Sequence, residues 1–120
     1  MQTARQNNGT HAEDAAAAWL EQAGWRLLAR NVKLGRDEID IVAIDPGPPA
    51  TLVCVEVRSS TSPDFGTPEE RVDRRKVAHL YRAAKSLQLE RRLPRRVDLV
   101  VVDRRARRSV FRHMRGVEPP

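Results

Sequence analysis

The sequence predicts a single α/β domain, a mixed β-sheet flanked by helices, with its elements in the order α-β-β-β-α-β-β. Three observations predict this fold. Residues 10–24 and 67–89 carry apolar side chains at helical spacing. Five shorter stretches are rich in Val, Ile and Leu and are bounded by turn residues. The length of 120 residues suits one domain with one core, so we expect residues 1–120 to form a single unit.

The first helix is expected to follow a polar stretch, residues 1–9. Residues 10–13 (Thr-His-Ala-Glu) have the form of a capping box, and Gly24 supplies the stop. One face of this helix is apolar and should pack inward: Ala12, Ala16, Trp19, Leu20 and Ala23. We expect residues 1–8 and 115–120 to be flexible.

The strands are expected at residues 25–32, 38–44, 51–58, 96–102 and 109–114. A break rich in proline and glycine, residues 45–49, separates the second and third strands, which are close enough to form a hairpin. A polar loop at residues 59–66 leads to the second helix. Residues 67–70 (Thr-Pro-Glu-Glu) supply that helix with an N-cap, a first-turn proline and a capping-box glutamate.

Composition indicates a globular protein with a polyanionic partner. Hydrophobic residues make up 40% and charged residues 32% of the chain, and the net charge is +6, mostly from arginine. Arginine forks match phosphate oxygens, although such a surface can also serve solubility alone. The single Cys54 excludes a disulfide framework and a zinc knuckle. Without a signal-peptide-like or membrane-spanning apolar run, we expect a cytoplasmic protein with no membrane contact.

Two acidic residues of the predicted hairpin should face each other. If the loop is symmetric about Pro48, Asp40 and Glu56 lie opposite one another, with Cβ atoms roughly 4.5–5.5 Å apart. Two carboxylates at that separation repel unless a positive group lies between them. A divalent cation or the nearby Arg58 could relieve the repulsion, and the alternative is that both acids point to solvent with their own salt-bridge partners.

Two further charged residues have two interpretations each. Lys76 lies on the apolar face of the second helix, where it either snorkels or reaches toward the acids or a phosphate. Glu13 either completes the capping box, which the sequence alone favours, or joins the acidic pair. No nucleotide-triphosphate or acyl-transfer motif is present. The histidines are expected at the surface: His11, His79 and His113.

Several short motifs together resemble a known bacterial family. They are GRDEIDIV at residues 35–42, VEVR at 55–58, FGTP at 65–68, Lys76, and RVDLV at 96–100. In this order and spacing they resemble the YraN-like family, whose members have largely unassigned function, and the likeness covers about residues 9–103. That family resembles the PD-(D/E)xK nucleases, including Holliday junction resolvases. The resemblance therefore implies a restriction-endonuclease-like fold.

The resemblance also implies roles for individual residues. Asp40 and Glu56 match the motif's two metal ligands, Glu13 matches a helix glutamate that completes the acidic cluster, and the backbone carbonyl of Val57 would be a further ligand. Such sites take Mg²⁺ or Mn²⁺. Arg58 stands at the motif's lysine. Arginine stays protonated, so it can orient and stabilise charge but is a poor general base, and Lys76 could partly substitute.

Two other positions depart from the family pattern. Asp37 stands where the family usually has glycine, and Ser60 lies near a position that is often basic in relatives. Together with Arg58, these departures question cleavage more than the fold.

The leading hypothesis is a divalent-metal-dependent DNA endonuclease, with branched DNA as one candidate substrate, in which the metal generates the attacking hydroxide. Arg58 and Lys76 would bind phosphate. Further arginines would hold the backbone without reading sequence: Arg91, Arg92, Arg95, Arg96, Arg104, Arg105, Arg107 and Arg108. One alternative is a non-catalytic DNA- or RNA-binding module on the same fold. Another is a ribosome-associated basic protein, for which no aromatic stacking platform is visible. Junction-cutting relatives also suggest a homodimer.

Overall fold

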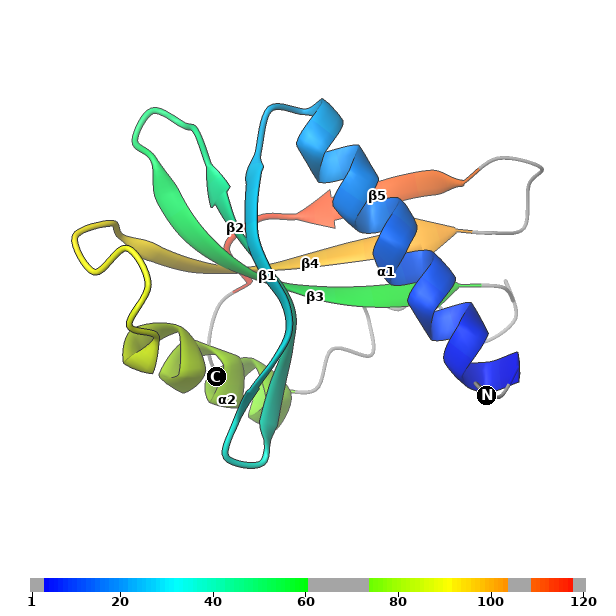
Figure 1. Cartoon of the computed structure of the whole chain (residues 1–120), viewed down its shortest axis with the longest axis horizontal. Helices are drawn as coiled ribbons and strands as arrows, with labels where there is room; N and C mark the ends of the chain where they lie inside the picture. Colours follow the sequence, from blue (N-terminus) through cyan, green and yellow to red (C-terminus); the bar gives the residue numbers. More distant parts are fainter. Residues whose placement is uncertain (1–3, 61–73, 104–108, 118–120) are drawn as a thin grey trace.

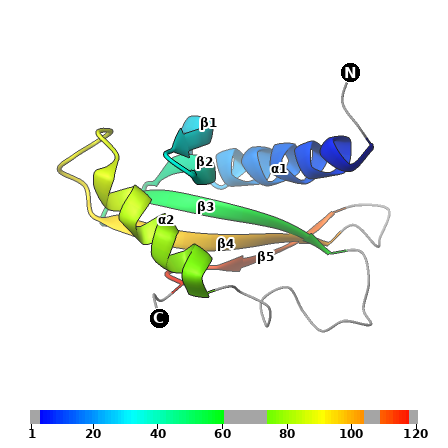
Figure 2. The same cartoon turned by 90° about the horizontal axis from the view of Figure 1, so that it is seen from below.

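The chain, described as a computed structural model, forms a five-stranded mixed sheet with one helix on each face (Figures 1 and 2). The structure describes residues 4–60, 74–103 and 109–117. The elements are α1 (Ala4–Gln22), β1 (Arg26–Leu34), β2 (Asp37–Asp45), β3 (Thr51–Ser60), α2 (Arg74–Ser86), β4 (Arg95–Asp103) and β5 (Val110–Met114). The predicted order of helices and strands is confirmed.

The strands lie in the spatial order β1-β2-β3-β4-β5. β1, β2 and β3 form an antiparallel meander, β3 and β4 run parallel, and β5 returns antiparallel along β4. The parallel pair requires a crossover, and α2 lies in it. In the β2–β3 hairpin Ile41 pairs with Val55 and Val42 with Cys54, which is the register of a loop symmetric about Pro48.

Two apolar clusters hold the helices to opposite faces of the sheet. The α1 cluster is built around Ala12, Ala16 and Leu20, which pack on strand residues such as Ile41 and Val55. The α2 cluster is built around Leu80, Ala83, Ala84 and Leu87, which pack on Leu52 and Cys54 among others. The central strands β3 and β4 are covered on both sides, which accounts for their near-continuous Val and Leu content. Cys54 is fully buried in this layer.

The ends of the helices differ from expectation. α1 begins at Ala4, so the predicted start at Thr10 is wrong, and Thr10 lies inside the helix rather than at a cap. The preceding residues include alanine, arginine and glutamine, which are good helix formers, and one glycine is a tolerable cost. Gly24, with a φ of 94°, ends α1 as predicted.

The second helix ends earlier than expected. α2 stops at Ser86, short of the predicted Leu89. Arg95 Nη2 donates hydrogen bonds to the carbonyls of Leu87 and Leu89, at 3.1 and 2.7 Å, and so satisfies backbone groups just after the end of α2. The predicted N-cap at residues 67–70 and the predicted basic turn at 104–108 lie outside the described residues.

Candidate functional site

Asp40 lies where β2 stops pairing with β3. Ile41 and Val55 are the last paired residues at this end of the hairpin. Beyond them Asp40 Oδ2 accepts a hydrogen bond of 2.8 Å from the backbone N–H of Val57. The N–H and C=O of one strand residue point to the same side of the strand, so the Val57 carbonyl is also directed toward β2. A carboxylate and a backbone carbonyl therefore face each other across the opening strands.

Asp40 also marks a change of face along β2. Ile39 packs in the α2 cluster, whereas Ile41 packs in the α1 cluster. Strict alternation would place both residues on one face, so the strand twists sharply at the residue between them. The position explains why Asp40 interacts electrostatically with Glu13 of α1 and with Lys76 of α2, although the two helices cover opposite faces.

Glu56 is the most constrained acid of the site. Its side chain is 14% exposed, and its Oε2 is buried with no hydrogen-bond partner. Arg58 Nε lies 3.6 Å from Oε1, and Lys76 Nζ lies 4.0 Å from Oε2, which is close for charges but too long for a hydrogen bond. Burial, and next the charge of Asp40, raises the pKa of Glu56 to about 7. Glu56 is therefore partly protonated at neutral pH.

The pKa of Asp40 is raised as well. Burial raises the pKa of Asp40 above its usual range, even though the Val57 hydrogen bond and Lys76 act in the opposite direction. Two neighbouring carboxyl groups with raised pKa values are a place where a cation would stabilise both ionised forms. The charge of Asp40 raises the pKa of Glu56, as expected if the two acids lie near each other across the hairpin.

The donor set fits a hard divalent cation. The orphaned oxygen of Glu56, the Asp40 carboxylate and the Val57 carbonyl are all oxygen ligands, and Mg²⁺ binds one or two carboxylates while keeping several waters. Across the described ranges, no three or more His, Cys, Asp or Glu side chains are grouped closely enough to hold a metal ion. The available set is therefore two carboxylates with a carbonyl, rather than the three-carboxylate cluster expected with Glu13.

Glu13 is held by an arginine that the sequence analysis did not identify. Arg30 of β1 places Nε 3.2 Å from Glu13 Oε1 and Nη2 2.6 Å from Asp14 Oδ1, so its guanidinium spans two neighbouring acids of α1. Burial and the charge of Asp40 raise the pKa of Glu13, and Arg30 opposes this. Glu13 lies close enough to influence Asp40, but its carboxylate is engaged by Arg30.

A shallow surface hollow adjoins Glu56. Its lining includes four charged residues, and the remaining wall is apolar. The charged residues are Glu56, Arg58, Lys76 and Asp98, and the apolar ones include Val77, Leu80 and Leu99. Lys76 of α2 therefore lies beside Glu56. This agrees with the interpretation in which Lys76 reaches toward the acids rather than snorkelling into solvent. The hollow brings two cations to the edge of the carboxylate pair.

The predicted backbone-binding arginines fall into three groups. Arg91 and Arg92 are exposed. Arg95 and Arg96 are engaged inside the protein, Arg95 with the carbonyls after α2 and Arg96 with Asp98 and Asp45. These contacts favour a structural role for Arg95 and Arg96. The arginines at 104, 105, 107 and 108 lie outside the described residues.

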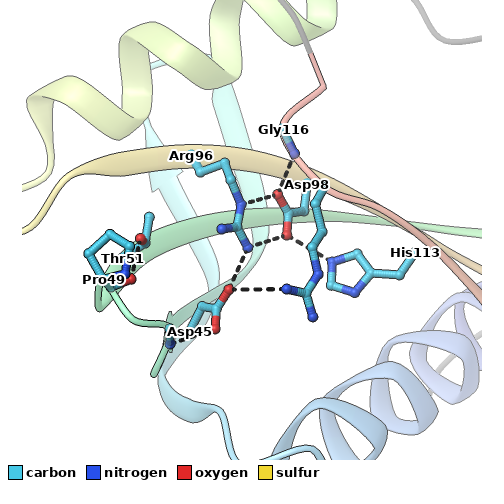
Figure 3. A network of polar contacts seen from close by, with 9 residues as sticks. Asp45, Pro49, Thr51, Arg96, Asp98, His113 and Gly116 are labelled. Atoms are coloured by element: carbon cyan, nitrogen blue, oxygen red, sulfur yellow. Dashed lines mark hydrogen bonds and ion pairs between the residues drawn. The ribbon is translucent and has the colours of Figure 1, made fainter.

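Arg96 belongs to a buried network that sequence analysis missed (Figure 3). Its Nε and Nη2 donate to Asp98 at 2.8 and 3.0 Å, and Nη2 also reaches Asp45 at 2.9 Å. Asp98 is fully buried and accepts a further bond of 2.9 Å from the Gly116 N–H. The available signal was the spacing of Arg96 and Asp98, two apart on a strand and hence on one face.

His113 completes this network and corrects the expectation of a surface histidine. Its side chain is only 10% exposed, and its Nε2 lies 2.8 Å from Asp98 Oδ2. The ring packs against Trp19 and Trp25. Burial alone would raise the pKa of Asp98, but the hydrogen bonds from His113, Arg96 and Gly116 outweigh it and hold that pKa below its usual range.

Comparison with known proteins identifies one family and no activity. The profile of the Uncharacterised protein family UPF0102 matches residues 12–102. A UPF0102 protein from Pseudarthrobacter chlorophenolicus is 41% identical over 113 residues, covering 91% of this chain and 83% of the relative. UPF0102 proteins from Moorella thermoacetica (44% over 84 residues; 70% and 68% covered) and Persephonella marina (42% over 83 residues; 69% of each) are also similar. None of the helices that the structure describes is long and apolar enough to cross a membrane.

Proposed function

This chain belongs to the uncharacterised protein family UPF0102, and from that premise we propose that it binds nucleic acid and hydrolyses phosphodiester bonds with a divalent cation. The observation that carries the proposal is the buried Oε2 of Glu56, which has no hydrogen-bond partner although the charge of Asp40 acts on the same carboxyl group. A protein that only needed two buried acids for stability would neutralise them with close hydrogen bonds, as it does for Asp98.

The proposed cation is Mg²⁺ or Mn²⁺, held by Asp40, Glu56 and the Val57 carbonyl. When bound, it would supply a nucleophile at neutral pH and neutralise charge on the scissile phosphate. Glu13 would add a ligand only by exchanging its contact with Arg30. DNA is the expected substrate, and a cytoplasmic location and a homodimer are part of the same hypothesis.

The cations beside Glu56 would hold the substrate. Arg58 and Lys76 line the hollow next to the carboxylates, where a phosphate could accept hydrogen bonds from both. Arginine is a permanent cation and a poor general base, so Arg58 would stabilise the negative charge that develops on the phosphate and would not remove a proton. In this arrangement the chain supplies positioning and charge.

A non-catalytic binding module is the second candidate. The observation that favours it is Arg58 itself, whose Nε lies 3.6 Å from Glu56 and partly neutralises the acid without a metal. If the Arg58–Glu56 contact replaces the cation, the basic surface would bind nucleic acid and the carboxylates would have no catalytic role.

A cleavage assay separates the two functions. Supercoiled plasmid and a synthetic four-way junction are incubated with Mg²⁺ or Mn²⁺ and with wild type, Asp40→Asn, Glu56→Gln, or Glu21→Gln as a control on an exposed acid of α1. A nuclease should lose cleavage on the order of 100-fold in the first two variants and keep it in the third, while all four bind DNA equally in Ca²⁺.

Calorimetry of Mn²⁺ binding provides a second measurement. Asp40→Asn and Glu56→Gln should each weaken Mn²⁺ binding strongly, and Glu21→Gln should not. Equal DNA binding by all four proteins without cleavage under either metal, together with no calorimetric Mn²⁺ signal, would establish the binding-module function.

A further inference from the structure

The exposed face of α2 carries charge of one sign only. The buried side of the helix consists of Val77, Leu80, Ala83 and Ala84. The charged residues of α2 are Arg74, Arg75, Lys76, Arg82 and Lys85, and the helix has no Asp or Glu. Because Lys76 turns toward Glu56, the others form the outer surface, which we call the α2 basic face: Arg74, Arg75, Arg82 and Lys85.

The α2 basic face is compact. At 100° per residue these four cations fall within an arc of about 100°, directly opposite the buried residues. Ala78 lies inside the same arc, and its small side chain leaves the space between the long basic side chains open. From Arg74 to Lys85 the face extends about 16 Å along the helix axis. That length corresponds to about five base-pair steps of duplex DNA.

Acidic partners of α2 lie at its flanks. His79 contacts Asp37 at 3.1 Å, and Lys76 contacts Glu56 at 4.0 Å. Arg82 and Lys85 stand three residues apart, and no Asp or Glu stands three or four residues from either in the sequence. Like charges at this spacing repel one another by a few tenths of a kcal/mol. A bound polyanion would reduce this repulsion, which no acid at helical spacing in the sequence reduces.

The helix on the opposite face of the sheet carries more acid. By sequence, α1 has Glu13, Asp14 and Glu21 against a single Arg5 (Figure 2). Arg30 of β1 pairs with two of these acids. Of the two helices, α2 therefore attracts a polyanion more strongly. The α2 side also holds the hollow that Glu56, Arg58 and Lys76 line. A backbone bound on α2 would therefore lie on the same side of the sheet as the candidate site, with the helix between them.

We propose that the α2 basic face, rather than the arginines at 91–96, is the surface on which this protein docks the phosphodiester backbone of duplex DNA. This inference rests on the proposed function and deepens it by locating the substrate path. The face positions the backbone through phosphate contacts and reads no sequence. Lys76, on the side of the same helix that faces the sheet, contacts Glu56 and is not part of this face.

The test compares two variants of equal charge. Arg82→Gln/Lys85→Gln removes two cations from the α2 basic face, and Arg91→Gln/Arg92→Gln removes two from the exposed turn after α2. Glutamine is a good helix former, so both variants should fold, which circular dichroism checks. Binding of a fluorescent 20-base-pair duplex is measured in Ca²⁺ from about 50 to 200 mM salt.

The α2 variant should bind the duplex at least tenfold more weakly at about 100 mM salt. The magnitude of its log–log salt slope should fall by about 2, because two phosphate contacts are lost. The turn variant should stay within about threefold of wild type. A weakened turn variant beside an unchanged α2 variant would overturn the inference, as would a wild type that binds anionic phosphatidylserine vesicles and no DNA.

Measuring plasmid cleavage alongside duplex binding distinguishes a failure of the docking surface from a failure of the proposed nuclease function. If Asp40→Asn abolishes plasmid cleavage but Arg82→Gln/Lys85→Gln leaves duplex binding unchanged, the nuclease proposal stands and the docking surface is wrong. If the α2 variant loses binding while no metal supports cleavage, the docking surface stands and the catalytic proposal fails.

Discussion

At the scale of single residues, Glu56 experiences opposing influences. Burial and Asp40 favour its neutral form, while Arg58 and Lys76 favour the carboxylate without closing a hydrogen bond to Oε2. With the pKa raised to about 7, the folded protein binds a proton here that the unfolded chain releases above about pH 4.5. The stabilising contribution is complete below the lower value and is lost as pH rises through the higher one.

Glu56→Gln should therefore change stability in a pH-dependent way. Glutamine stays neutral, so we expect the variant to unfold within about 0.5 kcal/mol of wild type at pH 5 and to be more stable by roughly 2 kcal/mol at pH 8. Urea unfolding in EDTA at both pH values measures the difference. A constant difference between the two pH values would mean that Glu56 titrates normally in the fold.

Some of this site was visible in the sequence and some was not. The positions of Asp40 and Glu56 followed from a hairpin symmetric about Pro48, since alternation and register need only local information. Arg30 could not be assigned, because its contact with Glu13 depends on how α1 docks on β1. His113 was placed wrongly for the same reason, since its partner Asp98 lies on a neighbouring strand.

At the scale of elements, the β2–β3 turn sets the register on which the site depends. Gly47 has a φ of 63°, and a Cβ added there would collide with the Pro49 carbonyl oxygen. Its N–H also donates to Asp45 Oδ1 at 3.0 Å. A side chain at this position would therefore meet backbone that cannot move without disturbing the hairpin.

Gly47→Ala should be more destabilising than Gly35→Ala. Both glycines have a φ of 63°, but a Cβ at Gly35 would have nothing within 4 Å. We expect about 1 kcal/mol of destabilisation at Gly35 from backbone conformation alone, and about 3 kcal/mol at Gly47, where steric conflict is added. Chemical denaturation of both variants measures the values, and equal losses would show that the turn relaxes freely.

The two helices show which helix ends can be predicted from the local sequence. Gly24 ends α1 where the sequence predicted, because a residue at positive φ is a local requirement. The start at Thr10 was wrong, because a capping-box pattern can also occur inside a longer helix. The early end of α2 is accompanied by a hydrogen bond from Arg95 of the next strand to the Leu87 carbonyl, a contact that no helix pattern contains.

At the scale of the whole molecule, the Asp98 network joins segments distant in sequence. It connects β4 to Asp45 at the end of β2, to His113 of β5 and to Gly116 (Figure 3). Arg96 and Arg115 also lie over the ring of Trp25, which follows α1. The network thus ties the end of β2 and the edge strand β5 to one buried carboxylate of β4.

Asp98→Asn should destabilise the protein by about 3 kcal/mol at pH 7, because Arg96 would lose its charged partner inside the fold. The pKa of Asp98 is held below its usual range, so this contribution is present at neutral pH and is lost as pH falls below about 4. Asp14→Asn, at an exposed pair with Arg30, should cost less than 1 kcal/mol. Thermal unfolding at pH 7 and pH 3 should show the two variants converging in acid.

The buried position of Cys54 gives the molecule a built-in reporter. Burial raises the pKa of its thiol to about 12, so the reactive thiolate is scarce while the sheet is intact. A maleimide would modify the chain only after β3 separates from its neighbours, and the labelling rate would count those openings. Because Glu56 is two residues away, a cation that ties β3 to β2 would slow the alkylation.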